Sequence, residues 1–302
     1  MRRVLEVIES ENLGKYEENV LLKKYTTYKV GGVASVLVYP KNEECLVKLL
    51  RVIKEENVKY KILGNGSNVL FSSKPYEGVI IKLDEFNSIK FLRGNKIRVG
   101  AGYSLIKLCL MACKKSLAGL EFAAGIPGNV GGAVFMNAGA YKSDMGYVVQ
   151  SIKVLTPELK IITLENKELN FHYRTSFLQT HPGYICLEVT FKLQKGKKEL
   201  IEEVIKERKQ RRIASQPLEY PSAGSVFRNP EGMFAGQMIE ELGLKGKMQG
   251  GAMVSEKHAN FIVNYKNATA EDIKSLIELV HDSVKEKYNV DMKVEQEFVN
   301  WE

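Results

Sequence analysis

The stretch from Ala124 to Tyr141, AGIPGNVGGAVFMNAGAY, holds five glycines in eighteen residues. Glycine tolerates positive φ angles and lets a ligand approach the main chain closely. Successive N–H groups at Gly125, Gly128, Gly131 and Gly132 can therefore turn toward one anion, for which phosphate or pyrophosphate is the natural ligand. A tight structural turn would explain the same glycines. The stretch lacks the Gly-Lys-Ser/Thr ending of a nucleotide P-loop.

A second glycine-rich turn, LGNGSNVL, runs from Leu63 to Leu70 and follows a strand-like segment at Lys59 to Leu63. Gly64 and Gly66 form a G-x-G pattern. The third glycine of a Rossmann fingerprint is missing, and the residues that follow do not open an amphipathic helix. Two such loops favour a bipartite dinucleotide site in a different fold.

Six short segments occur in order along the chain: TTYKVGG (26–32), LGNGSNVL, AGIPGNVGGAVFMNAGAY, YRTSF (173–177), GSVFRNP (224–230) and VEQEF (294–298). This order resembles the motif set of the UDP-N-acetylenolpyruvoylglucosamine reductases, in the shorter type without a long insertion. The resemblance extends from about Tyr25 to Phe298. It implies an α+β fold, with a two-subdomain FAD-binding module similar to the vanillyl-alcohol-oxidase/PCMH flavoproteins and a C-terminal α+β substrate-binding domain.

The resemblance also implies an activity, namely reduction of UDP-N-acetylglucosamine enolpyruvate to UDP-N-acetylmuramate in peptidoglycan precursor synthesis. No side chain donates hydride, so a flavin must carry it from a nicotinamide. We therefore expect noncovalent FAD, with NADPH as hydride donor in a ping-pong cycle. The expected FAD-binding residues are Gly64, Asn65, Gly66, Ser67, Asn68, Gly125, Pro127, Gly128, Asn129, Gly131, Gly132, Asn137, Gly139 and Ala140.

Three residues are expected to carry the chemistry on the substrate. Hydride addition leaves negative charge on the substrate as an aci-carboxylate, which the planar guanidinium of Arg174 is suited to hold. Ser225 matches the residue that protonates the substrate carbon in the family. Glu297 matches the second, catalytic glutamate of the family's L-E-x-E-V, and we expect it to be protonated or hydrogen-bonded in the reactive complex. Because residues two apart in a strand share a face, alternation alone does not separate it from Glu295.

Further residues are expected at the substrate, and others depart from the family pattern. The substrate candidates are Tyr173, Asn229, Gln237, Glu240 and Lys245, while Phe122, Tyr141 and Tyr147 could pack near flavin or uridine or belong to the core. The departures are Asn129 in place of Ser or Thr, which would offer an amide to the pyrophosphate, Lys142 in place of a frequent glycine, and Phe298 and Trp301 near the C-terminus.

Hydrophobic patterns and turn residues predict the elements that position these residues. Expected strands are 35–39, 59–63 parallel to it, 79–83, the hairpins 89–92/97–99 and 148–155/159–164, 184–193 closing the second sheet, and 260–263. Expected helices are 43–56 capped by Asn42, one capped by Ser104, 197–214, 235–242 and one opened by a capping box at Thr269 to Asp272. We expect three parts: FAD subdomains at 1–84 and 85–215, and a substrate domain at 216–302.

Composition fits a cytoplasmic globular enzyme. Of the 302 residues, 44% are hydrophobic and 26% charged, and no apolar run is long enough for a membrane span. The four cysteines are expected to be reduced core thiols, and the histidines have no ligand spacing, so no metal is expected. The net charge of +8 comes with interleaved acids and bases, as in 197–212, which favours a solvated helix face over nucleic-acid binding. We expect a monomer.

Two alternatives remain open at this stage. A flavin oxidase of the same FAD-binding fold, acting on an alcohol or sugar, is disfavoured by the C-terminal segments SVFRN and EQEF and by the lack of a histidine in either glycine-rich loop for covalent flavin attachment. A basic binding module without enzymatic activity is the other. A flavin spectrum in the purified protein would exclude the basic binding module.

Overall fold

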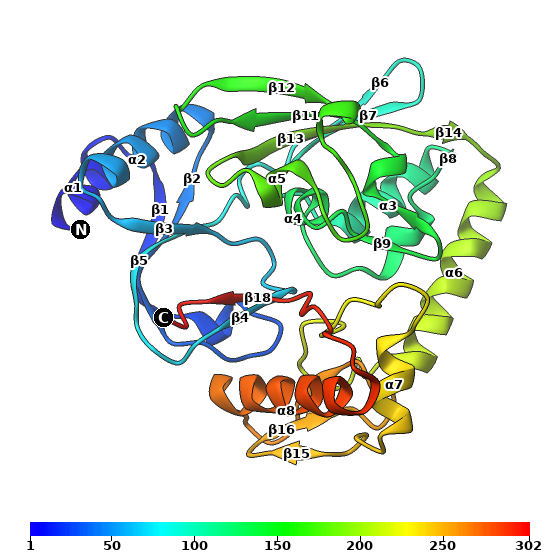
Figure 1. The fold of residues 1–302 in the computed structure, drawn as a ribbon. Helices are drawn as coiled ribbons and strands as arrows, with labels where there is room; N and C mark the ends of the chain where they lie inside the picture. Colours follow the sequence, from blue (N-terminus) through cyan, green and yellow to red (C-terminus); the bar gives the residue numbers. More distant parts are fainter. The chain divides into compact units, whose positions relative to one another are not determined.

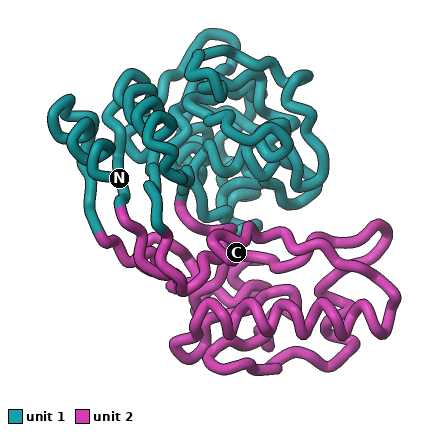
Figure 2. Tube along the Cα trace, turned by 60° about the vertical axis from the view of Figure 1, so that its left-hand side comes forward, with its two compact units in different colours: residues 1–18, 36–64, 77–210 teal, residues 19–35, 65–76, 211–302 magenta.

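The computed structural model describes residues 1–302 and divides into two compact units (Figure 2). Unit 1 comprises residues 1–18, 36–64 and 77–210, and unit 2 comprises residues 19–35, 65–76 and 211–302. The chain therefore passes between the units several times. The three-part division at residues 84/85 and 215/216 stays a prediction.

A four-stranded sheet with the order β1-β2-β5-β3 begins the fold (Figure 1). Its strands are β1 (Gly14–Leu21), β2 (Val33–Pro40), β3 (Lys59–Ile62) and β5 (Tyr76–Ile81). β3 pairs in parallel with β5, and β5 lies between β3 and β2 in the sheet. Two helices, α1 (Arg2–Ser10) and α2 (Glu43–Glu55), pack against each other. Asn42 caps α2 as expected, because its side chain accepts a hydrogen bond from the Cys45 N–H at 2.9 Å.

A five-stranded antiparallel sheet with the order β12-β11-β13-β7-β6 forms the second part of unit 1. Both predicted hairpins are confirmed in it. The expectation that residues 184–193 close the sheet is wrong, because β13 lies at its centre, where Val189 and Phe191 are fully buried. The strands are β6 (Ile89–Leu92), β7 (Lys96–Gly100), β11 (Val149–Leu155), β12 (Ile161–Glu165) and β13 (Ile185–Lys192).

Helices and short strands beside this sheet carry the second glycine-rich stretch. Ser104 caps α3 by accepting a hydrogen bond from the Lys107 N–H at 3.4 Å. The elements are α3 (Leu105–Lys114), β8 (Leu117–Ala118), the 3₁₀ helix η2 (Glu121–Gly125), α4 (Val130–Phe135), β9 (Gly139–Ala140), β10 (Ser143–Asp144), η3 (Met145–Tyr147), η4 (Asn166–Glu168), α5 (Phe177–Thr180) and β14 (Gln194–Lys195). In α6 (Lys198–Ser215) only Ile201 is buried, which agrees with a solvated helix.

Unit 2 is built around α8 (Ala270–Tyr288), whose capping box forms as predicted between Thr269 and Asp272. Its remaining elements are η1 (Leu22–Lys24), β4 (Val69–Phe71), α7 (Ala235–Glu241), β15 (Met248–Gln249), β16 (Ala252–Val254), β17 (Ile262–Asn264) and β18 (Glu297–Val299). β18 pairs in parallel with β4, so that residue Glu297 lies opposite Val69. The end of the chain is thus joined to the strand that follows the first glycine-rich turn.

Candidate functional site

The second glycine-rich stretch lies in unit 1, where its glycines have different surroundings. A Cβ atom at Gly131 would lie 2.9 Å from the Cβ of Ala101, and the Gly131 N–H donates to the Ala101 carbonyl at 2.8 Å. The expectation that this N–H faces an anion is therefore wrong, because it is used within the fold. Gly139 is also needed for packing, since a Cβ there would lie 2.6 Å from Asp144. By contrast, Gly132 has no atom within 4 Å of the Cβ position.

Gly64 and Asn129 bring the two glycine-rich segments together within unit 1. Gly64 has open space except for the Oδ1 atom of Asn129, 3.3 Å from the Cβ position. The Nδ2 of Asn129 donates to the Gly102 carbonyl at 2.6 Å, whereas the buried Oδ1 has no hydrogen-bond partner in the chain. One of the two N–H groups of this amide is thus used within the fold, and the expected amide contact to pyrophosphate stays a prediction. A buried acceptor without a donor is costly, and a hydroxyl or N–H of FAD would satisfy it. These residues therefore fit the cofactor.

The rest of the first glycine-rich turn, residues 65–68, belongs to unit 2. Gly66 has φ +64°, and a Cβ there would lie 2.1 Å from the carbonyl oxygen of Tyr25, so only glycine fits this turn. Asn68 binds the C-terminal segment twice: its Nδ2 donates to the Glu295 carbonyl at 3.1 Å, and its own carbonyl accepts the Glu297 N–H at 2.9 Å. The expected cofactor turn thus also holds the backbone on both sides of Gln296.

Arg174 occupies a tight turn in unit 1 with a left-handed backbone, φ +56°. Reciprocal backbone hydrogen bonds at 3.0 Å close this turn between His172 and Thr175. The Nη2 of Arg174 donates to the Gly139 carbonyl at 3.0 Å, and its guanidinium lies 5.3 Å from the ring centre of Tyr173. A non-glycine residue in this conformation is strained by about 1–2 kcal/mol, and such strain is often found at functional sites.

Side-chain hydrogen bonds connect the Arg174 turn to the glycine-rich stretch. Asn137, which is 2% exposed, donates to the His172 carbonyl at 2.8 Å and accepts the Gly146 N–H at 3.0 Å. Its side chain therefore has a structural role besides the expected one at the cofactor. Gln179 donates to the carbonyls of Arg174 and Phe135, at 3.0 and 2.7 Å. Sequence reasoning missed Gln179, which only its position five residues after Arg174 could have suggested.

Ser225 and Glu297 both lie in unit 2, where backbone hydrogen bonds join the two segments that carry them. Gly224, at φ +77°, has no atom within 4 Å of the Cβ position, so the chain leaves open space beside Ser225. The Glu295 N–H donates to the Val226 carbonyl at 2.7 Å. Glu297 begins β18, whereas Glu295 lies outside the strand, so the alternation expected for two strand residues does not apply to this pair.

The expected substrate residues of unit 2 gather at α7. The Oδ1 of Asn229 accepts the N–H of Ala235, the first residue of this helix, at 3.1 Å. Lys245 pairs with Glu240 at 2.9 Å, and Gln237 donates to Glu241 at 2.8 Å. Near this pair, burial lowers the pKa of His258, which sequence reasoning did not single out. A neutral imidazole beside a lysine is the resulting arrangement.

The candidate aromatic residues separate into core and surface. Phe122 is 2% exposed and belongs to the core of unit 1. Tyr147 and Tyr173 are exposed, at 77% and 54%. Tyr141 is exposed as well, but its hydroxyl donates to the Arg208 carbonyl at 3.0 Å and the Arg208 guanidinium lies 5.0 Å from its ring centre. Only the exposed rings can contact a ligand.

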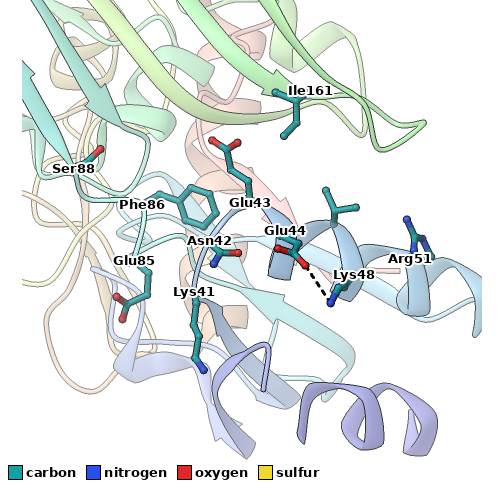
Figure 3. Close-up of a pocket in the computed structure, with 11 residues that line it drawn as sticks. Lys41, Asn42, Glu43, Glu44, Lys48, Arg51, Glu85, Phe86, Ser88 and Ile161 are labelled. Carbon is teal, nitrogen blue, oxygen red and sulfur yellow. Dashed lines mark ion pairs between the residues drawn. The ribbon is translucent and has the colours of Figure 1, made fainter. Parts of the chain in front are cut away.

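A surface recess of about 740 Å³ lies at the start of α2 (Figure 3). None of the predicted site residues lines it. Three of its charged side chains are paired: Lys48 is bonded to Glu44 at 3.3 Å and to Glu11 at 3.0 Å, and Glu43 is bonded to Lys153 at 2.6 Å. The recess is therefore no candidate for the functional site.

The cysteines offer no reactive thiol, and the acidic and histidine side chains form no metal site. All four cysteines are free, and burial raises the pKa of Cys109 and of Cys186 to about 12, which leaves these thiols protonated and unreactive. The structure has no group of three or more His, Cys, Asp or Glu side chains able to hold a metal ion. None of its helices combines the length and the apolar character that a membrane span requires.

Comparison with known proteins identifies the family. Residues 34–165 match the model of an FAD binding domain, and residues 216–299 match that of the C-terminal domain of UDP-N-acetylenolpyruvoylglucosamine reductase. UDP-N-acetylenolpyruvoylglucosamine reductase 1 of Bacillus cereus is 47% identical, over 98% of both chains. The chain belongs to the UDP-N-acetylenolpyruvoylglucosamine reductase family. It is an oxidoreductase with an FAD-binding domain.

Further relatives agree with this family and with the predicted fold. The reductase of Halalkalibacterium halodurans is 44% identical over 99% of both chains. The crystal structure of the UDP-N-acetylenolpyruvylglucosamine reductase from Thermus caldophilus matches 94% of this chain and 99% of that one, with a TM-score of 0.82 and 36% identity. Phl p 4.0202, a glucose dehydrogenase, matches 65% of this chain and 44% of its own, with a TM-score of 0.50 and 14% identity, which shows only that the fold is shared. The predicted α+β flavoprotein fold is confirmed.

Proposed function

We propose that this enzyme reduces UDP-N-acetylglucosamine enolpyruvate to UDP-N-acetylmuramate, with NADPH as hydride donor. The observation that supports it is that one chain joins the FAD binding domain to the reductase C-terminal domain, at 47% identity to a curated reductase over 98% of its length. Bound FAD would take a hydride from NADPH and deliver it to the vinyl carbon of the substrate.

The residues at the FAD loops supply shape rather than charge. The open space at Gly132 and Gly64 admits close backbone approach, and the Oδ1 of Asn129 offers an acceptor for a hydroxyl or N–H of the cofactor. We assign the other residues expected at FAD within 64–68 and 125–140 to the same site. Asn68 and Asn137 contribute mainly by fixing the loops, as their side-chain bonds indicate.

The residues proposed for catalysis act on the substrate carboxylate and its neighbouring carbon. The planar guanidinium of Arg174 would stabilise the aci-carboxylate that forms on hydride addition. Ser225 would donate the proton to the carbon that bears this group, after which its oxygen regains a proton from solvent. Glu297 would hydrogen-bond the developing charge, directly or through a water. Tyr173, Asn229, Gln237, Glu240 and Lys245 remain our candidates for binding the sugar nucleotide.

A Ser225→Ala variant tests this assignment in two half-reactions. We expect NADPH to reduce the flavin at the wild-type rate, because no proton donor to the substrate is needed in that step. Reoxidation by the enolpyruvyl sugar nucleotide should slow by roughly 10²-fold or more. Rapid mixing with flavin absorbance as the signal measures both rates. Equal slowing of the two steps would instead indicate a role of Ser225 in folding or flavin binding.

The oxidase alternative is tested with the unmodified enzyme. The reductase should oxidise NADPH in the absence of oxygen only when the enolpyruvyl sugar nucleotide is present. Oxidation of an alcohol or sugar with oxygen as acceptor, and no response to the sugar nucleotide, would contradict the proposal. The cytoplasmic location and the monomeric state stay predictions.

A further inference from the structure

The backbone on both sides of Ser225 is held by two buried amide side chains of unit 2. Asn260, which is 5% exposed, holds the positions after Ser225. Its Oδ1 accepts the Phe227 N–H at 2.9 Å, and its Nδ2 donates to the Phe227 carbonyl at 2.8 Å. Its backbone carbonyl also accepts the Val226 N–H at 2.9 Å. One residue thus fixes the two positions that come directly after Ser225.

Gln296, which is 4% exposed, holds the positions before Ser225. Its Nε2 lies 3.2 Å from the Ala223 carbonyl and 3.4 Å from the Gly224 carbonyl, to which it donates. Its Oε1 accepts the hydroxyl of Tyr28 at 3.0 Å. Tyr28 is fully buried, and burial raises the pKa of its hydroxyl, so it stays a neutral donor that fixes the orientation of the amide.

Ser225 lies between the backbone positions that the two amides hold, and Gly224 directly precedes it. Gly224 has a positive φ of +77°, and no atom lies within 4 Å of its Cβ position, so neither a side chain nor side-chain packing restrains the backbone there. The Ser225 side chain has one rotatable bond to its oxygen, so the position of that oxygen depends on the backbone that carries it. Nothing in the chain hydrogen-bonds the hydroxyl itself. The two amides therefore fix the backbone from which the proton donor projects.

We propose that Gln296 and Asn260 are positioning residues for Ser225, and that Tyr28 orients Gln296. The inference rests on the proposed function, because it concerns the proton that Ser225 delivers. It gives a role to Gln296, a buried and uncharged residue between Glu295 and Glu297. It also links three separate sequence segments, 26–32, 224–230 and 294–298, through side chains of one unit.

The test compares Gln296→Met and Asn260→Ala with Ser225→Ala in the flavin-loaded enzyme. Because a displacement of about 1 Å can cost about 10²-fold in rate, we expect reoxidation by the enolpyruvyl sugar nucleotide to slow about 10- to 100-fold in both variants. Reduction by NADPH should stay within about twofold of wild type. The solvent deuterium isotope effect on reoxidation should rise, since proton delivery becomes the slow step.

A matched control separates positioning from loss of stability. Thr269→Ala removes the cap of α8 in the same unit and should lower the unfolding temperature, without changing either half-reaction or the isotope effect. If Gln296→Met does not fold, Tyr28→Phe removes only the hydroxyl that orients the amide and should give a smaller slowing with the same rise in the isotope effect.

The possible outcomes separate failure of the positioning role from failure of the proposed role of Ser225. Suppose that Ser225→Ala reoxidises slowly. A wild-type rate of reoxidation in both Gln296→Met and Asn260→Ala would then overturn the positioning role. If Gln296→Met does not fold, Tyr28→Phe takes its place in this comparison. If Ser225→Ala itself reoxidises at the wild-type rate, the proposed role of Ser225 fails, and positioning of that residue with it. Slowing of both half-reactions to the same extent would also overturn the inference, because the amides would then act on flavin binding.

Discussion

At the scale of single residues, the same residue type has different roles within one loop. Gly131 and Gly139 lack side chains because neighbouring atoms of the fold occupy the space, whereas Gly132 borders open space. Asparagine differs in the same way: both amide atoms of Asn137 are bonded within the fold, and the oxygen of Asn129 is not. We therefore expect Gly132 and the side-chain oxygen of Asn129 to be the ones that meet a cofactor.

This difference predicts opposite results for two adjacent glycines. Gly132→Val should leave the fold intact and abolish FAD retention, because the new side chain enters the open space. Gly131→Val should lower stability by roughly 1–3 kcal/mol, because it overpacks against Ala101. Thermal unfolding of the apoprotein and flavin content after gel filtration measure the two effects. Full flavin occupancy in Gly132→Val would show that this face does not border the cofactor.

At the scale of elements, short turns with left-handed residues set the positions of the site. β9 and β10 are joined by Tyr141 and Lys142, with φ values of +55° and +61°. Two positive φ values in a two-residue hairpin loop are typical of a type I′ turn, which favours glycine at its second position. The structure thus gives a physical reason for the glycine that the resemblance implies where this chain has Lys142.

Replacing that residue by glycine should stabilise the protein. The left-handed conformation costs a residue with a Cβ roughly 1–2 kcal/mol, and the greater freedom of glycine in the unfolded chain offsets roughly 0.5–1 kcal/mol of the gain. Lys142→Gly should therefore raise the free energy of unfolding by about 0.5–1 kcal/mol. Lys142→Ala, which keeps the Cβ, is the control and should bring no gain. Chemical denaturation measures both, and an equal gain in the two variants would assign the effect to loss of the lysine charge.

At the scale of the whole molecule, local signals in the sequence predict most helices and strands. They do not predict the pairing of strands that are far apart in the chain. Caps at Asn42, Ser104 and Thr269 are short-range patterns, and each was confirmed. The parallel pairing of β18 with β4 joins residues more than two hundred positions apart, which no local pattern encodes. The helix α1 was missed although Val4, Val7 and Ile8 have helical spacing and are buried.

The candidate site shows the same limit. The glycine-rich segments and the likeness to a family pointed to Gly132, Ser225 and Glu297. The amides that hold Ser225 were not found, because a buried glutamine and a surface glutamine look alike in sequence. Only the contacts of Gln296 with Tyr28 and with the Ala223 carbonyl reveal its role.

The net charge of the molecule leads to a last prediction, about the approach of substrate. The formal charge is +8 at pH 7, whereas the proposed sugar nucleotide is an anion, so long-range attraction should speed their encounter. The Debye length falls from about 30 Å at 0.01 M salt to about 8 Å at 0.15 M. The second-order rate constant for reoxidation of the reduced flavin by the sugar nucleotide should therefore fall several-fold over this range, while the saturating rate stays constant. Reoxidation by oxygen, a neutral acceptor, is the control and should not respond to salt. If both acceptors respond equally, or neither does, charge steering has no part in substrate capture.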